Sequence, residues 1–356
     1  MLVGLSPQYL QWMLLAWAAL FVFVLIAAFL RPWRASRKPI RTLFKFSFSL
    51  WVIAFAAILS ETLFVSLYST TDAFSLSLVS KRWNERFVHR NNWNCRDAKR
   101  YEGEIPAGTK RLAIVGDSFA FGHGIKNIKD RFGDLLEAQL NKETKDRWEV
   151  YNLGEPGADT GWEVERLEKL GREQNFRADV VLLVYCLNDI ERLVPSTHEI
   201  VGSIINDPPK NFLCLNFYLP NFLYYRLNHF QRPEVRGFFG WLKDGYQGEI
   251  WEKQKERLAA IKKWCGERNA KLVVVVFPFM VPSALQAGDY AFEGVHRILS
   301  DQFAALKVPA IDLLPVYRKV NGRDLVVGAF DAHPDEDANA IAADEIWKGL
   351  LKDGVK

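Results

Sequence analysis

Two apolar runs near the N-terminus constrain the fold more than any other feature of this 356-residue chain. Residues 9–30 are almost uncharged, and about 20 such residues in a helix cross the roughly 30 Å hydrocarbon core of a membrane. Residues 46–68 form a second run, which contains one carboxylate, Glu61. No basic cluster precedes the first run, which argues against a cleaved signal peptide. We therefore expect two transmembrane helices, with Glu61 at an interfacial end of the second.

The segment between the two runs carries six basic residues and no acidic ones. They are Arg31, Arg34, Arg37, Lys38, Arg41 and Lys45. Short loops rich in lysine and arginine stay in the cytoplasm. The N-terminus and the large C-terminal part are therefore expected outside it, in the periplasm if the cell is Gram-negative. The six residues also explain the net charge of +4. Because the rest of the chain is nearly neutral, we expect no nucleic-acid partner.

Beyond these runs, strand-like and helix-like segments alternate. Runs typical of buried strands occupy residues 112–115, 148–151, 180–185, 272–277 and 310–311. Helical patterns occupy residues 130–141, 161–174, 249–268, 290–306 and 336–351. Strands that alternate with helices form parallel sheets covered on both faces. The sequence therefore predicts an α/β fold, a doubly wound five-stranded parallel sheet preceded by two transmembrane helices.

These patterns divide the chain into a membrane anchor at 1–70, a connector at 71–110 and a large domain at 111–356. The part of the chain from about Asn91 onward is expected to fold and to keep its activity without the anchor. Residues 194–248 form a long, aromatic-rich insertion between its third and fourth strands. Such a loop usually has a function or a structure of its own. Two roles stay open for the insertion: a lid or wall of a substrate pocket, or a helix that covers the core.

Chemically active side chains follow the predicted strands. Ser118 comes directly after the first strand, a glycine-rich loop with Gly157 follows the second, and Asn188 follows the third. Asp331 and His333 precede the last helical pattern. Ligands meet parallel sheets at the carboxyl ends of the strands. Together these residues offer a nucleophile, a base, an orienting carboxylate and oxyanion donors.

The same residues lie in an ordered series of sequence blocks: NNWNCRD, VGDSFAFGHGI, YNLGEPGADT, VVLLVYCLNDI and DAHPDEDAN. In these blocks the chain resembles the SGNH hydrolases, the GDSL-type esterase and lipase family. The resemblance implies a flavodoxin-like three-layer sandwich, with Ser118 as nucleophile and Asp331 and His333 completing a catalytic triad. It also implies an oxyanion hole formed by the Ser118 amide, Gly157 and Asn188, and a reaction without metal or organic cofactor.

Three positions depart from the family pattern. Phe119 replaces the usual leucine, and Cys186 stands where glycine is common. Asp331 precedes His333 by two residues, whereas three is the commoner spacing. If Asp331 is not the acid of the triad, Asp335 and Asp337 are the alternatives. Both are expected in the first turn of the last helix, where carboxylates are favoured.

Other polar residues in or near these blocks, including Asn91, Arg96 and Asp97 of the first, are expected to be structural. His123 is the rival base, but its place five residues after Ser118 favours an ordinary polar loop residue. Asp189 is expected to stabilise the turn after Asn188. The four cysteines lack metal-ligand spacing, so we expect no zinc site, and their pairing stays open. They are Cys95, Cys186, Cys214 and Cys265.

The expected function is that of a membrane-anchored serine esterase outside the cytoplasm. Its candidate substrate is an acyl ester, with O-acetyl on a surface or exported glycan considered first. An O-acyltransferase that uses the same triad, together with partner proteins of a polysaccharide pathway, is the first alternative. A non-catalytic anchored binding module is the second. Fold does not separate these three functions.

Overall fold

The computed structural model describes residues 4–195, 202–204, 206–229, 232, 240–280, 285, 290–320 and 325–352. The chain forms two compact units, which are described separately. One comprises Met1–Arg86 and Asp207–Gln231, here called the anchor unit. The other comprises Phe87–Asn206 and Arg232–Lys356, here called the sheet unit. The expected connector 71–110 is thus divided at residue 86, and the expected insertion 194–248 contributes its middle part to the anchor unit.

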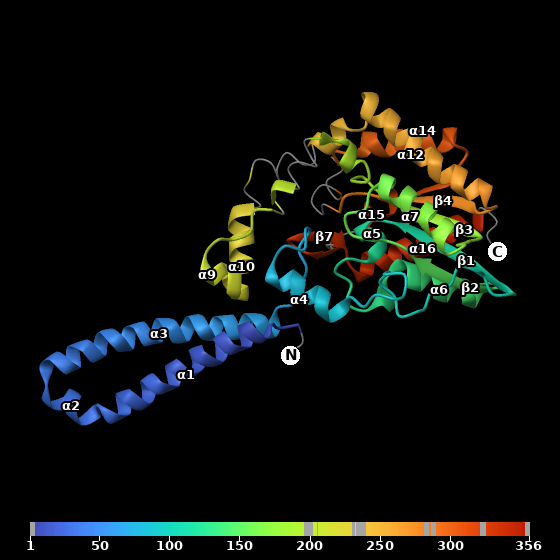
Figure 1. Ribbon diagram of the computed structural model, residues 1–356. Helices are drawn as coiled ribbons and strands as arrows, with labels where there is room; N and C mark the ends of the chain where they lie inside the picture. Colours follow the sequence, from blue (N-terminus) through green and yellow to red (C-terminus); the bar gives the residue numbers. More distant parts are fainter. Residues whose placement is uncertain are drawn as a thin grey trace. The chain divides into compact units, whose positions relative to one another are not determined.

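The sheet unit is built on a parallel sheet of five strands (Figure 1). Its strands are β1 (Thr109–Gly116), β2 (Arg147–Asn152), β3 (Val180–Cys186), β4 (Lys271–Phe277) and β5 (Ala310–Asp312). They lie in the order β2-β1-β3-β4-β5, and every neighbouring pair is parallel. All seven residues of β3 are buried, which explains its continuous aliphatic sequence. This strand order is the flavodoxin-like one, so the predicted fold class is confirmed.

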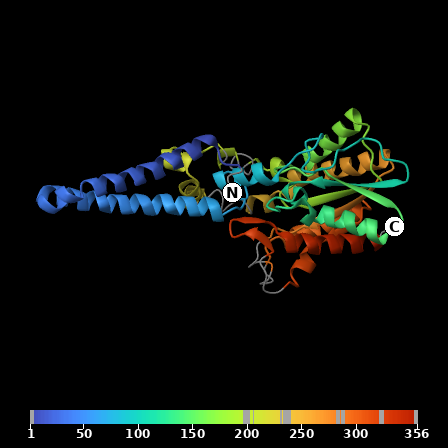
Figure 2. The ribbon, with the colours of Figure 1, turned by 90° about the horizontal axis from the view of Figure 1, so that it is seen from below.

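Helices cover both faces of the sheet (Figure 2). The main ones are α6 (Phe132–Glu143), α7 (Thr160–Glu173), α12 (Gly248–Glu267), α14 (Glu293–Ala305) and α16 (Glu336–Lys352). Connections between parallel strands are right-handed. In this sheet the chain moves from β1 outward to β2 and then back past β1 to β3, so the connecting helices fall on opposite faces. Accordingly, α6 packs with α16, and α7 packs with α12. The expected strands and helices agree with these elements within a few residues.

Short elements complete the sheet unit. They are the helices α5 (Ser118–Phe121) and α15 (Leu314–Tyr317), the 3-10 turns η1 (Ile128–Asp130) and η2 (Glu191–Leu193), and the strands β6 (Val326–Gly328) and β7 (Asp331–Pro334). β6 and β7 pair in an antiparallel ribbon that the sequence did not predict. Its strands have only three and four residues, too few for alternation to be recognised.

The anchor unit begins with a helical hairpin. Its helices α1 (Pro7–Phe29) and α3 (Lys38–Leu67) are each long and apolar enough to cross a membrane. A six-residue helix, α2 (Arg31–Ser36), joins them, so most of the expected basic loop is helical. Many large apolar side chains of the hairpin are exposed. Two such helices satisfy the length requirement of a membrane span.

Four further elements belong to the anchor unit: α4 (Leu78–Phe87), α9 (Phe212–Asn216), α10 (Tyr218–Tyr224) and the π-helical turn η3 (Tyr225–His229). α4 ends at the boundary with the sheet unit. The buried core of the anchor unit joins residues from three regions of the sequence, namely Tyr9, Met13, Val65, Val79 and Tyr218. The segment 207–231 therefore packs with the hairpin although it lies between β3 and α12 in the sequence.

Candidate active site

Ser118 lies at the carboxyl end of β1, at the first position of α5. Asp117 caps this helix, because its Oδ1 accepts the Phe119 amide at 2.8 Å. Gly122 ends the helix in left-handed backbone, with φ of +73°, which favours glycine. The sheet order reverses its direction between β1 and β3, and ligands bind doubly wound sheets at such a point. The Ser118 hydroxyl is therefore held where a substrate would enter.

Ser118, His333 and Asp331 form a continuous series of hydrogen-bonding contacts. His333 Nε2 lies 2.7 Å from Ser118 Oγ, and His333 Nδ1 lies 2.5 Å from Asp331 Oδ1. Asp331 is 1% exposed, so its carboxylate is almost fully shielded from water. A proton on Nδ1, facing the carboxylate, leaves Nε2 able to accept the serine proton. The structure thus brings together the three residues that the sequence analysis selected for a triad.

The two-residue spacing of Asp331 and His333 follows from the strand β7. In a strand, residues i and i+2 lie on the same side. Asp331 and His333 are both buried and Ala332 between them is exposed, as this alternation requires. Asp331 Oδ1 also accepts the His333 amide at 3.2 Å. The departure from the commoner spacing therefore does not separate the two side chains.

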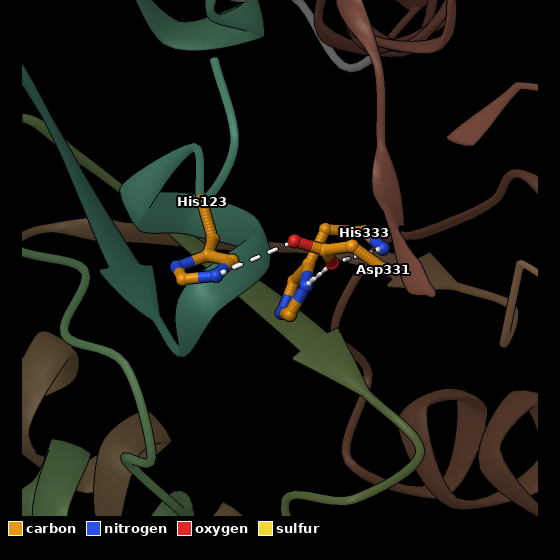
Figure 3. A group of neighbouring side chains, drawn as sticks. All are labelled: His123, Asp331 and His333. Carbon is orange, nitrogen blue, oxygen red and sulfur yellow. Dashed lines mark hydrogen bonds and ion pairs between the residues drawn. The ribbon is translucent and has the colours of Figure 1, made fainter. Parts of the chain in front are cut away.

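His123 lies in a turn, as expected, but its side chain is buried next to this group (Figure 3). Its Nε2 lies 3.5 Å from Asp331 Oδ2, and its ring centroid lies 4.5 Å from that of His333. Its flanking residues, Gly122 and Gly124, both have positive φ. This Gly-His-Gly turn is the sequence signal that would have identified His123, because such a turn can direct one side chain inward.

Arg96 holds the turn that carries His123. It is 1% exposed, and its guanidinium donates to the carbonyls of Gly122 and Ile125 on either side of His123. Arg96 lies in the NNWNCRD block, whose residues were expected to be structural. Asn91 and Asp97 also have structural bonds, since Asn91 accepts the Trp93 amide at 2.9 Å and Asp97 accepts the Tyr101 hydroxyl at 2.7 Å.

His123, Asp331 and His333 also form the one group of possible metal ligands among the described residues, with ligand atoms within 4.8 Å of one another. Both ring nitrogens of His333 already have partners, Ser118 and Asp331. A metal ion would have to displace one of these contacts. The arrangement therefore suits proton transfer to and from Ser118 better than metal coordination.

The two other predicted oxyanion residues lie at neighbouring strand ends. Gly157 follows β2 and has a φ of +75°, and Asn188 follows β3. Because β1, β2 and β3 are adjacent and parallel, both loops lie at the same edge of the sheet as Ser118. Asn188 Nδ2 donates to Asp117 Oδ2 at 3.1 Å. Asp117, the residue before Ser118, thus bonds to the Asn188 side chain as well as capping α5. The sequence suggested only the capping role.

The remaining acidic residues near the blocks have structural contacts. Asp189 Oδ2 accepts the Cys186 amide at 3.0 Å, as expected for a turn residue. Asp335 Oδ1 accepts the Ala338 amide at 2.8 Å at the start of α16, and Asp337 lies in the first turn of that helix. All four cysteines are free. The structure therefore leaves Asp331 as the acid in contact with His333.

Two buried carboxyl groups of the sheet unit, Asp117 and Glu163, have raised pKa values. Burial raises the pKa of Asp117, although the Phe119 amide and Asn188 oppose this change. Burial, followed by the charges of Asp117 and Asp159, raises the pKa of Glu163 well above its usual range. Within the described part of the chain, neither oxygen of Glu163 has a hydrogen-bond partner. We infer that Glu163 is protonated at neutral pH, because an isolated buried carboxylate is strongly disfavoured.

This protonation predicts how stability changes with pH. Folded protein keeps the Glu163 proton, whereas unfolded protein loses it above the ordinary glutamate pKa, so stability falls as pH rises from there toward the folded pKa. The slope for one group is at most about 1.4 kcal/mol per pH unit. Glu163→Gln should remove this loss and make the protein more stable than wild type at pH 8, with a smaller difference at pH 5.

Thermal unfolding of both proteins across this pH range measures the effect. Glu165→Gln is the matched control, because Glu165 is exposed on the same helix. It should leave the pH dependence unchanged. Parallel stability curves for wild type and Glu163→Gln would contradict protonation of Glu163.

Several solved structures are similar to the sheet-forming part of this chain. TesA shares 17% identity, covers 68% of this chain and 98% of its own, and gives a TM-score of 0.43. A lipolytic protein of the G-D-S-L family from Veillonella parvula shares 12% sequence identity. The match covers 67% of this chain and 97% of that protein, with a TM-score of 0.39. The acetyl xylan esterase AlAXEase shares 17% sequence identity. The match covers 67% of this chain and 99% of that protein, with a TM-score of 0.41. No curated protein matches the chain.

The family comparison covers most of the sheet unit. Residues 114–341 match the GDSL-like lipase/acylhydrolase family, from within β1 to within α16. The matched region is more than half of the chain and includes Ser118, Asn188, Asp331 and His333. The chain belongs to the GDSL-like lipase/acylhydrolase family and is an ester-bond hydrolase.

Proposed function

We propose that this hydrolase is a membrane-anchored serine esterase that acts outside the cytoplasm, with Ser118 as nucleophile, His333 as base and Asp331 as orienting acid. The observation that carries the proposal is the series of contacts from Ser118 Oγ through His333 to Asp331. A serine needs such a base to become nucleophilic at neutral pH. No cofactor is needed for this chemistry.

The reaction begins when Ser118 Oγ attacks the ester carbonyl and His333 Nε2 takes its proton. Asp331 stabilises the resulting imidazolium, and His123 steadies the second oxygen of that carboxylate. His333 then protonates the leaving alcohol, which leaves an acyl group on Ser118. Water, activated by His333, releases the acid and restores the serine. During both steps, the Ser118 amide, the Gly157 amide and the Asn188 side chain stabilise the oxyanion.

Asn188→Ala tests this oxyanion hole. We expect kcat to fall on the order of 10²–10³-fold, because one donor to the developing charge is lost. Ser118 should still react slowly with a fluorophosphonate probe, since His333 and Asp331 remain. A variant with unchanged kcat and only a raised KM would contradict the proposed role, because it would show a loss of substrate binding alone.

The proposed topology rests on the two apolar helices and the basic turn between them. The positive-inside rule places the turn in the cytoplasm and both ends of the hairpin outside. A periplasmic reporter, such as alkaline phosphatase, fused after Lys356 should therefore be active. The same reporter fused after Arg37 should be inactive. The reverse pattern would refute an extracytoplasmic site.

The proposed substrate is an acyl ester, with O-acetyl groups on a surface or exported glycan tested first. The proposed compartment supports this choice, because acylated surface polymers are accessible there. Purified full-length protein should release acetate from a generic acetyl ester with water as the only acceptor. Turnover that requires a glycan acceptor would instead favour an O-acyltransferase. Failure of Ser118 to react with a fluorophosphonate would favour a binding module.

A further inference from the structure

The segment that separates β3 from α12 in the sequence belongs to the anchor unit. We propose that residues 211–229, here called the interfacial segment, lie at the outer surface of the lipid bilayer and bind it with their exposed apolar side. This inference rests on the proposed membrane anchor. It assigns to the insertion neither of the two roles considered from the sequence, and it extends the membrane contact beyond the two spanning helices.

Glu61 ties the interfacial segment to the hairpin. It lies within α3 and is only 5% exposed. Its Oε1 accepts the Tyr218 amide at 2.7 Å and its Oε2 accepts the Leu219 amide at 2.8 Å. Its Oε1 also accepts the Tyr9 hydroxyl at 3.1 Å. A carboxylate in an apolar helix is costly unless it is hydrogen-bonded, so these donors give Glu61 a specific structural role.

Aromatic packing extends this attachment. Tyr9 contacts Tyr218 with ring centroids 4.9 Å apart, and Phe222 contacts Phe64 at 5.2 Å. Trp12 contacts Phe212 at 5.5 Å. These partners come from the N-terminal part of α1 and the C-terminal part of α3, the end of the hairpin away from α2 (Figure 1). The interfacial segment therefore lies at the hairpin end that the proposed topology places outside.

Asn221 connects the same segment to α4. Its Oδ1 accepts the Leu78 amide at 2.8 Å, and its Nδ2 donates to the Cys214 carbonyl at 2.7 Å. Asn221 is 3% exposed. Together with Glu61, it satisfies polar groups on the inner side of α9 and α10. The large apolar side chains of the segment nevertheless remain exposed.

Five large apolar side chains of the segment are strongly exposed. They are Phe212 (52%), Leu213 (58%), Leu215 (48%), Leu223 (44%) and Leu227 (61%). No charged residue occurs from 211 to 225. Helices of five and seven residues are far too short to span a bilayer. A short element with an exposed apolar side and a single arginine, Arg226, is suited to the boundary between headgroups and acyl chains.

The choice of lipid as the occupant follows from continuity with the spans. Trp12, Leu63 and Leu67 are also exposed at the same end of the hairpin. Four aromatic residues at this end, Trp12, Tyr68, Tyr224 and Tyr225, are at least partly exposed, as in the aromatic belts found at membrane interfaces. The exposed apolar surface of the spans thus continues directly onto the segment, and a bilayer that surrounds the spans would meet both.

Spin labels on full-length protein in phosphatidylcholine and phosphatidylglycerol nanodiscs test this inference. Leu213→Cys and Leu227→Cys, each in a Cys214→Ser background, place a nitroxide at an exposed position of the segment. We expect collisions with oxygen to exceed those with a water-soluble nickel chelate several-fold at both sites, because oxygen concentrates in lipid. Leu25→Cys on α1 is the lipid reference, and Glu85→Cys on α4 is the aqueous reference. Retained ester hydrolysis shows that the sheet unit of each labelled protein is folded.

The references separate the possible failures. If residues 213 and 227 behave like residue 85 while residue 25 is in lipid, the segment is in water and the inference is wrong, although the anchor stands. If residue 25 is itself aqueous, the proposed anchor fails. Protection of 213 and 227 from both collision partners would overturn lipid binding in favour of a protein partner or a second copy of the chain.

Discussion

Replacing Ser118 or His333 with alanine should each abolish ester hydrolysis, with a fall in kcat on the order of 10⁴–10⁶-fold. The expected size follows from their contact, 2.7 Å between Ser118 Oγ and His333 Nε2. Because the two groups act in one proton transfer, the double variant should be little slower than either single variant. Single-turnover hydrolysis of an acetyl ester, with folding checked by circular dichroism, measures the effect.

The sheet unit offers a matched control for the histidine. His296 Nδ1 lies 2.9 Å from Asp312 Oδ1, so this buried histidine, away from the site, also pairs with an aspartate. It lies on α14, and His296→Gln should keep its kcat. A folded His333→Ala protein with nearly normal kcat would disprove the proposed base. Equal losses in His296→Gln and His333→Ala would show a structural effect common to buried histidines that pair with an aspartate.

The second large effect is expected at Asp331. Asp331→Asn should reduce kcat about 10⁴-fold, because an amide favours the wrong imidazole tautomer and cannot stabilise the imidazolium. The contact of 2.5 Å to His333 Nδ1 and the near-complete burial of Asp331 make this carboxylate hard to replace by water. Binding of substrate should change little, so the loss should appear in kcat and not in KM.

Asp335→Asn is the control for Asp331→Asn. Asp335 lies two residues after His333, but its Oδ1 accepts the Ala338 amide at the start of α16. Its substitution should lower thermal stability slightly and leave kcat unchanged, since asparagine can also cap a helix. An active Asp331→Asn protein beside an inactive Asp335→Asn protein would reverse the assignment of the acid and leave Ser118 and His333 in place.

The segment 207–231 changes what is expected of the sheet unit alone. The sequence suggested that a chain beginning near Asn91 would fold without the anchor. In the structure, Tyr218 and Phe222 are packed against the hairpin, so removal of the hairpin would expose these rings together with the apolar side chains already exposed. A soluble form of the sheet unit would therefore also require replacement of residues 207–231 by a short polar linker.

The sequence by itself determined the order of elements and most of the site. The β-strands have aliphatic runs because both faces of a parallel sheet are buried, and such runs are visible without tertiary information. The family blocks placed Ser118, Asn188, Asp331 and His333 at strand ends or near the last helix. Two apolar runs identified α1 and α3, because span length depends only on local composition.

Only the tertiary structure decided which distant groups meet. Asp331 and His333 point to the same side of the chain because both lie on the strand β7. This strand is too short to be recognised by alternation in the sequence. The burial of His123 depends on a turn that Arg96 holds from a distance along the chain. Glu61 has its partners 157 and 158 residues away, at Tyr218 and Leu219. Such contacts depend on the packing of whole elements, which local hydrophobic patterns and turn residues do not specify.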